Sequence, residues 1–298
     1  MKPLQLLFFL FMSLVPVRSW SQTDSTLQSA NADSIGKAAD STVKTKTTFS
    51  TGVDFYSNLH YFGRTDSLRS TAWVPNVLLQ FGSGIFINSS LIFVNSAGQA
   101  LKYTAATLGG GYKWGRPEKV KGWTGSVYAA KFFYSNSLLV QSSQEGQAGA
   151  NVVYHNKIAN INMGGSMAFG DQTDFFLNLG FDHLFKYKSK TGKSIYAIIP
   201  SLSFNAGTQK FTNTYYKSEI FPLTDTVVTE TSKNFKVLSI ELSVPVVFVH
   251  NKWAIIFTPG IVLPQSVIKV EGRPDLSENA STLGYANLGI SYTFGRKK

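Results

Sequence analysis

The residues of this chain that could carry acid–base or metal chemistry are few and scattered. There are four histidines and no cysteine. Without cysteine there is no thiolate metal site, no disulfide framework and no cysteine nucleophile. His155 and His250 each begin a His-Asn-Lys sequence, which indicates a turn used twice and not a pair of metal ligands. We therefore expect no metal site, no cofactor and no catalytic group.

His60 is the histidine for which a hydrolytic role stays open. It follows Asn58 by two positions, and the chain has many serines, so an arrangement of asparagine, histidine and serine is not excluded by counting. No local motif of a membrane phospholipase or deacylase accompanies it. We expect that the protein is not an enzyme, and a lipid-modifying enzyme is kept as the third alternative.

Five charged residues carry more information because the alternation of their segments predicts that they face the interior: Asp54, Lys113, Lys131, Asp182 and Glu241. A charge in such surroundings needs water or a partner. One interpretation is an internal field that selects polar or charged solutes. The other is a set of salt bridges that holds a closed, filled interior together. Both require elements that place these side chains on one face.

The elements that follow Phe49 are predicted to be strands, because no segment has a sustained helical period and apolar residues alternate with small or polar ones. In residues 237–250, for example, Ile240 and Leu242 alternate with Ser239 and Glu241. Such segments number about twelve: 49–62, 70–81, 85–95, 102–114, 123–135, 147–155, 158–169, 174–187, 194–206, 235–249, 252–264 and 282–294.

The composition of the polar face indicates which side of these strands is wet. A soluble surface carries many charged residues along its strands, whereas only 15% of this chain is charged. The polar face is mostly Gly, Ser, Asn, Thr and Ala, which suits a confined interior, while Leu, Ile and Phe suit lipid. Closed barrels also satisfy every backbone group in hydrocarbon. We therefore predict an all-β protein, a single transmembrane antiparallel up-and-down β-barrel.

Aromatic residues near predicted strand ends support this interpretation. Trp114 and Trp123 flank one turn, Tyr187 and Tyr196 flank another, and Trp253 follows a third. Amphipathic rings at such positions are typical of the two membrane interfaces. The alternative is that these aromatic residues are scattered through a soluble core.

The regions outside the strands predict export. Residues 1–21 combine Lys2, an apolar run too short to span a bilayer and small residues near Ser21, as in a cleaved signal peptide. Residues 22–48 are polar and are predicted to form a flexible periplasmic extension. Residues 49–295 form the predicted barrel, and 296–298 a basic C-terminal overhang. The expected location is the bacterial outer membrane, with outer-membrane lipid as a partner.

Loop lengths predict the orientation. An even strand number leaves both termini on one side, and barrels of this kind keep short turns in the periplasm. Short links fall on the predicted terminal side, and long ones, such as 207–234 and 265–281, fall on the other. We therefore expect both termini in the periplasm. The net charge of +11 is spread over turns and forms no stripe interleaved with aromatic residues, so no nucleic-acid partner is expected.

At this point the sequence resembles the outer-membrane β-barrel proteins of Gram-negative bacteria over residues 49–294. The most specific element is the closing segment Leu288 to Phe294, which is similar to the terminal aromatic signal of that family. The resemblance implies that Tyr292 and Phe294 form an assembly signal and that the barrel-assembly machinery is a partner. Family members often stop at the final aromatic residue, whereas this chain continues for four residues.

The leading functional hypothesis is a passive, porin-like channel for small polar or charged solutes. The alternative is a non-conducting barrel that anchors or binds a partner through its long external loops. The link 207–234 contains Tyr215, Tyr216 and Phe221, an apolar cluster that suits either a constriction folded inward or a partner-binding surface.

Overall fold

The computed structural model describes residues 47–62, 64–65, 70–95, 100–115, 122–135, 144–170, 173–208, 212–219, 224–231, 235–265 and 282–295. For residues 212–219 and 224–231 it describes the backbone only. The predicted signal peptide, nearly all of the predicted extension and the C-terminal overhang lie outside these ranges. Within these ranges no helix is long and apolar enough to cross a bilayer.

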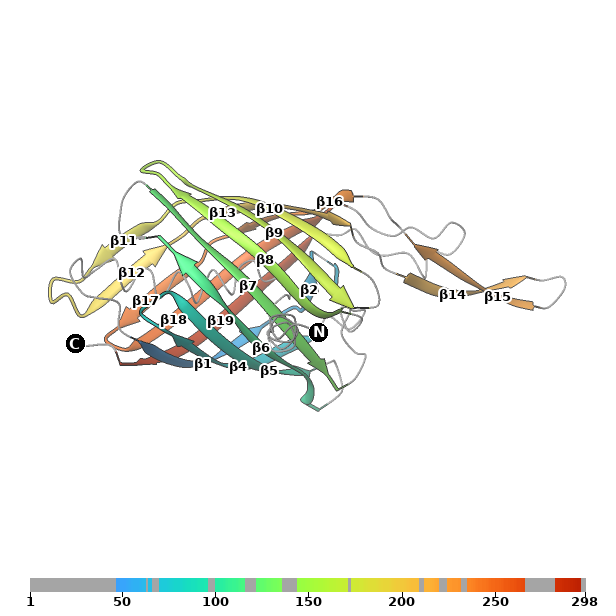
Figure 1. Ribbon diagram of the computed structural model, residues 1–298, viewed down its shortest axis with the longest axis horizontal. Helices are drawn as coiled ribbons and strands as arrows, with labels where there is room; N and C mark the ends of the chain where they lie inside the picture. The colour runs from blue at the N-terminus through green and yellow to red at the C-terminus, as the bar shows by residue number, and fades with distance from the viewer. Residues whose placement is uncertain are drawn as a thin grey trace, which may run out of the picture.

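The described chain forms a closed antiparallel barrel of twelve strands, three of them interrupted (Figure 1). The uninterrupted strands are β1 (Thr48–Tyr56), β4 (Thr71–Gln80), β5 (Ile85–Asn95), β6 (Lys102–Trp114), β7 (Gly122–Tyr134), β8 (Gln144–His155), β9 (Asn160–Gly170), β18 (Trp253–Pro264) and β19 (Leu283–Phe294). The interrupted strands are β10 (Asp174–Asp182) with β11 (Phe185–Lys188), β12 (Ser194–Ile198) with β13 (Ser201–Thr208), and β16 (Phe235–Ser243) with β17 (Val246–His250). The number and order of strands confirm the prediction.

Two of the interruptions occur at proline. Pro200 separates β12 from β13, and Pro245 separates β16 from β17. Proline has no N–H to donate to a neighbouring strand, so the ladder breaks there. The neighbouring backbone groups still find partners: the Ile199 N–H donates to the Pro245 carbonyl at 2.9 Å. The two strands on either side of each proline therefore occupy one strand position of the barrel.

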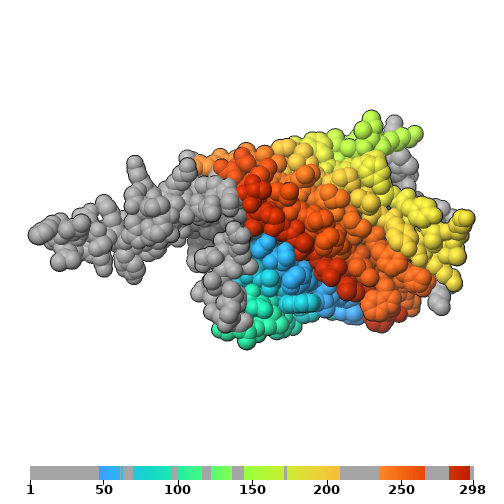
Figure 2. Space-filling model, turned by 180° about the vertical axis from the view of Figure 1, so that it is seen from behind, coloured from blue at the N-terminus to red at the C-terminus, as the bar shows by residue number. Residues whose placement is uncertain are grey.

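The barrel closes where its first strand meets its last. β1 pairs with β19 from Phe49 opposite Phe294 to Tyr56 opposite Asn287. Figure 2 shows this seam as a continuous surface in which the blue of β1 adjoins the red of β19. Because no edge is left between these strands, their backbone groups are paired as a spanning structure requires.

The two ends of the barrel differ. We call the end that holds residues 82–84, 156–159, 189–193 and 251–252, with the start of β1 and the end of β19, the turn end. The opposite end is the loop end. The turn at 251–252 has two residues, and Asn251 has a positive φ of 53°, as a tight hairpin turn requires. Both strand termini thus share one end, as predicted, and the links at the other end range from three residues between β9 and β10 to the long segments that follow β13 and β18.

The first strand is shorter than the sequence predicts. The alternation reaches residue 62, but β1 ends at Tyr56. The chain then forms the short hairpin of β2 (His60–Tyr61) and β3 (Arg64–Thr65), and β2 appears within the ring of barrel strands in Figure 1. The remaining strands, β14 (Thr212–Glu219) and β15 (Thr224–Thr231), pair only with each other and extend beyond the loop end.

Candidate channel interior

The outer face of the barrel is apolar, and its turn end carries aromatic pairs. Trp123 packs on Tyr154 with ring centroids 4.8 Å apart, and Trp253 packs on Tyr292 at 5.0 Å. The predicted interfacial residue Tyr187 is exposed at 62%. Between the ends, residues such as Leu177, 56% exposed, face outward. An exposed belt of this kind is stable only against lipid.

The middle of the interior is polar around its whole circumference. Nearly every strand contributes a small amide or hydroxyl side chain to the inward face: Asn76, Asn88, Ser90, Thr107, Asn151, Asn162, Ser166, Asn178, Asn205, Ser239, Thr258 and Asn287. Several of these side chains bind one another across strands. Asn178 donates to Asn205 at 2.9 Å, and Asn205 donates to Ser239 at 3.0 Å.

Two of the predicted carboxylates lie in this lining and are held by amides. Asp54 accepts a hydrogen bond from Asn76 at 2.7 Å. Asp182 accepts one from Asn160 at 2.6 Å and another from Asn162. Each bond joins adjacent strands, so the amides fix the carboxylates against the wall and satisfy part of their hydrogen-bonding capacity. Both residues face inward, as predicted.

Glu241 is held in a different way. Its carboxylate is 4% exposed and accepts a hydrogen bond from the Tyr285 hydroxyl. To reach it, Tyr285 on β19 lies across β18 directly over Gly260, where an added Cβ would be 2.3 Å from the ring. Only glycine permits this close approach. Sequence reasoning missed Tyr285, although a glycine within an otherwise apolar strand is a signal of such an approach.

The two predicted lysines lie on opposite faces. Lys113 faces inward, with its Nζ 5.0 Å from the centre of the Phe86 ring. Lys131 faces outward, so its predicted place in the lumen is wrong. It shares the outward face of β7 with Trp123, Val127 and Phe133, and its Nζ lies 5.8 Å from the Phe133 ring. A long lysine stem can lie along the outside of the barrel near its rim.

A hydrogen-bonded chain of side chains lines one side of the turn end, on β7 to β10, whereas the inward face of β12, β17 and β18 carries a buried apolar cluster of Ile195, Ala197, Ile199, Val247, Val249 and Ile256. The Thr124 hydroxyl lies 2.9 Å from His155 Nε2, and His155 Nδ1 lies 3.2 Å from Asn160 Oδ1. Asn160 in turn donates to Asp182. The predicted turn residue His155 is therefore part of the lining. Among the described residues no group of three or more metal-ligating side chains is present.

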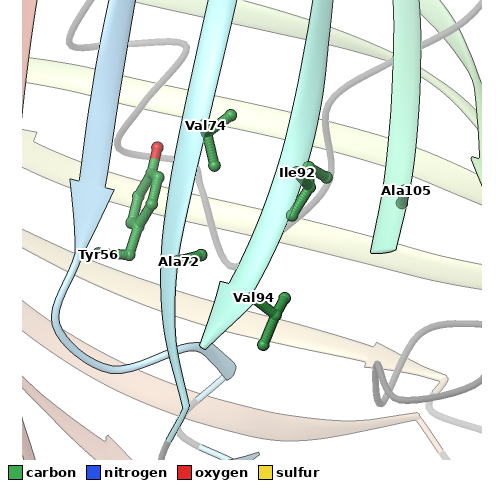
Figure 3. Packing of buried hydrophobic residues seen from close by; sticks show 6 residues of the cluster. All are labelled: Tyr56, Ala72, Val74, Ile92, Val94 and Ala105. Atoms are coloured by element: carbon green, nitrogen blue, oxygen red, sulfur yellow. The ribbon is translucent and has the colours of Figure 1, made fainter. Parts of the chain in front are cut away.

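The loop end of the interior is apolar. Tyr56, Ala72, Val74, Ile92, Val94 and Ala105 form a buried cluster on the inward side of β1, β4, β5 and β6 (Figure 3). Leu59, from the segment that follows β1, packs against this cluster. A second cluster, of Ala168, Phe176 and Leu238, lies on β9, β10 and β16. Strict alternation in residues 237–250 would place Leu238 outward with Ile240 and Leu242, but a bulge opposite Asn205 and Ala206 turns it inward.

Residues Ser57 to Phe62, which we call the inner loop, join these two clusters. The Asn58 side chain donates to the Gly284 carbonyl at 2.8 Å, and the His60 ring lies 4.9 Å from that of Tyr285. Phe62 stacks on Phe176 at 5.3 Å. Burial lowers the pKa of His60 from 6.5 to about 4, so the ring is neutral at pH 7.

The inner loop lies inside the barrel, where the link 207–234 could have folded inward as a constriction. Tyr215 and Tyr216 both lie in β14, in a hairpin that stands outside the barrel in Figure 1. Their side chains and the whole of Phe221 lie outside the described parts of the structure. Sequence reasoning missed Leu59 and Phe62. Phe62 precedes a glycine and follows Tyr61, a spacing that suits a two-residue hairpin turn.

A closed barrel with a lipid-compatible exterior and a polar interior defines the class of this protein: it is a transmembrane β-barrel of the outer-membrane type. No protein-family model matches the chain, and no curated protein matches it. Similar solved structures include the KdgM porin in complex with disordered oligogalacturonate, at 8% identity and a TM-score of 0.43 over 83% of this chain and 99% of that one.

Two further solved structures are similar over most of their lengths. An outer membrane channel from Pseudomonas putida F1 is 12% identical, with a TM-score of 0.44 over 85% of this chain and 97% of that one. LpxR from Salmonella typhimurium is 10% identical, with a TM-score of 0.42 over 82% and 99%. At these identities the likeness concerns the barrel alone, and the function must be argued from the interior.

Proposed function

We propose that the protein is a passive channel of the bacterial outer membrane for small polar solutes. The observation that supports this most directly is the polar ring in the middle of the interior, where amides and hydroxyls replace the apolar side chains of a filled core. Groups of this kind replace the hydration of a passing solute without binding it tightly. The aromatic pairs and the apolar exterior support the location.

Charge supports a weak preference for cations. Of the five charged residues singled out from the sequence, the four that face inward are three carboxylates and one lysine. A fixed negative charge in a narrow, partly desolvated passage attracts cations more strongly than the same charge in bulk water. The preference is weak because amides and a phenol already share the carboxylate charges.

Planar-bilayer recording of the purified full-length protein tests the channel. We expect discrete conductance steps in symmetric KCl and a reversal potential in a KCl gradient that indicates cation preference. Protein refolded without a native-like sheet, checked by circular dichroism, serves as the control. If neither the wild type nor Phe62→Ala passes current in many independent insertions of folded protein, the protein is not a channel.

A second candidate, hydrolysis, is supported by the chain at the turn end. A hydroxyl, an imidazole and an amide carbonyl follow one another in Thr124, His155 and Asn160, the order used by nucleophile, base and orienting group in hydrolases. Hydrolysis of a chromogenic ester that is lost in Thr124→Val would support this candidate. Equal rates in the wild type and the variant would remove it.

The remaining alternative is a non-conducting anchor that binds a partner through the hairpin of β14 and β15. Among the described strands, those of this hairpin pair with each other and with no other. Deletion of residues 212–231 should then abolish capture of the partner, whereas a channel should keep its conductance.

We also propose that Tyr292 and Phe294 serve as an assembly signal. Both lie on the outer face of β19, and Phe294 packs on Phe49 at 5.7 Å where the barrel closes. Outward rings at the last strand are accessible to an assembly machine before closure.

A further inference from the structure

We infer that the inner loop is a plug that closes the loop end of the lumen. Its tip, Phe62, packs on the wall opposite β1, the strand that the loop follows. This inference rests on the proposed channel function. In the closed order of strands, β10 is five steps from β1 through β19, β18, β16 and β13, and seven steps in the other direction. A contact between Phe62 and Phe176 on β10 therefore spans the interior.

The first half of the inner loop is fixed to the strands beside it. At its start, Ser57 donates its N–H to the Ala286 carbonyl at 3.1 Å and accepts the Ala286 N–H at 2.8 Å. Leu59 donates its N–H to the Ser70 carbonyl at 2.8 Å and packs against the apolar cluster of Figure 3. The start of the loop thus follows β19, and only its tip reaches the far wall.

The seat of Phe62 is built from apolar groups. Its ring stacks on Phe176 and contacts the cluster that Ala168 and Leu238 complete. The Phe176 ring itself lies over Gly207, where an added Cβ would be 2.6 Å from the ring. This packing fixes the Phe176 ring as a flat platform. The contact excludes water from a passage whose middle is otherwise polar.

The backbone of Phe62 supports the same conclusion. Its φ of 51° lies in the left-handed region, which a bulky residue adopts only at a cost. Asparagine or glycine would fit this turn with less strain. Such strain persists where surrounding contacts enforce it and clusters at clamps and switches. Here the strained turn directs the phenyl ring into the seat.

Because the tip is held by side-chain contacts and not by a barrel ladder, it can leave the seat without unfolding the barrel. A stacked aromatic pair contributes modestly, so removal of one ring should raise the open fraction by about fivefold. We expect Phe62→Ala and Phe176→Ala each to increase macroscopic conductance by about that factor. Phe133→Ala, which removes an outward ring that is 47% exposed, is the matched control and should leave conductance unchanged.

A cross-link tests the plug directly, since the natural chain has no cysteine to interfere. In Phe62→Cys/Phe176→Cys, a short bis-methanethiosulfonate reagent should join the two residues and lower conductance to the closed level. Reduction of the cross-link should raise the conductance about fivefold above the closed level, in line with the stacking energy. Each single-cysteine variant, which reacts but cannot be bridged, should show no such reversible block.

The outcomes separate the plug from the channel. Equal conductance in bridged and reduced protein, or no bridging in folded protein, overturns the plug and leaves the channel intact. If the wild type passes little current and Phe62→Ala passes much more, both proposals are supported. If neither the wild type nor any variant conducts, the channel fails, and the plug fails with it.

Discussion

The middle of the lumen and its loop end are lined by the same strands but are held in different ways. In the middle, polar side chains bind their neighbours on adjacent strands, as Asn76 binds Asp54 and Asn205 binds Ser239. At the loop end, apolar clusters on two walls are joined by the inner loop, whose tip crosses the interior.

This difference separates a fixed lining from a releasable one. Hydrogen bonds between adjacent strands move only if the barrel itself deforms, so the middle is rigid. The contacts of Phe62 join residues far apart in the chain and include ring stacking on Phe176 and packing against Ala168 and Leu238. A channel built in this way would select solutes in its middle and control access at its loop end.

Acidification should release the inner loop, and this is the largest effect that we expect. His60 has a pKa of about 4 in its buried position and about 6.5 once the loop reaches water. Above pH 6.5 the neutral ring contributes fully to the closed state. As pH falls from 6.5 towards 4, protonation of His60 favours the released state. The difference between the two pKa values corresponds to about 3 kcal/mol in the free energy of release. Conductance should therefore rise between pH 6.5 and pH 4.

The groups near His60 provide the controls. Tyr285 lies against its ring, and Glu241 binds the Tyr285 hydroxyl. His60→Gln should remove most of the pH dependence, while Glu241→Gln should retain it. If conductance is flat from pH 7 to pH 4 in the wild type, or if Glu241→Gln abolishes the dependence, His60 does not control the loop.

Gly260→Ala should produce the next largest effect, by disturbing the fixed lining. The new methyl group would collide with the Tyr285 ring and pull its hydroxyl away from Glu241. Overpacking together with a buried carboxylate that loses a donor costs about 2 kcal/mol. The midpoint of thermal unfolding in detergent should fall clearly.

Gly284→Ala is the matched control because an added Cβ there meets nothing within 4 Å. Its unfolding midpoint should equal that of the wild type. A similar midpoint for Gly260→Ala would mean that the Tyr285 ring does not depend on the space above Gly260.

The sequence predicted the barrel well because alternation and turn spacing are local properties. All twelve predicted segments correspond to strand positions of the barrel, and the prolines that interrupt two of them do not change which face is inward. Trp123 and Phe133 were sufficient to place Lys131 outward, since residues an even number of positions apart share a face.

The contents of the lumen could not be predicted in the same way. Alternation continues past Tyr56 to residue 62, and the turn signal after Tyr61 does not show that the chain has already left the wall at Tyr56. The bulge that turns Leu238 inward depends on its partner strand. The contacts of Phe62 with Phe176 and of Tyr285 with Glu241 join distant parts of the chain, and one sequence carries no signal for such pairs.

The smallest effect that we expect is a change in ion selectivity when a single charge is removed. It distinguishes a charge that faces the interior from one that faces outward. Glu241→Gln keeps an oxygen that can accept from Tyr285 but removes an inward charge. The permeability ratio of K⁺ to Cl⁻, obtained from the reversal potential, should fall by about twofold because one charge of a few is lost. Lys131→Gln removes an outward charge at the lipid-facing surface and should leave the ratio unchanged. Both variants lose one charge and gain the same side chain, so the pair separates position from chemistry. A ratio that changes in Lys131→Gln and not in Glu241→Gln would reverse the assignment of faces on β7 and β16.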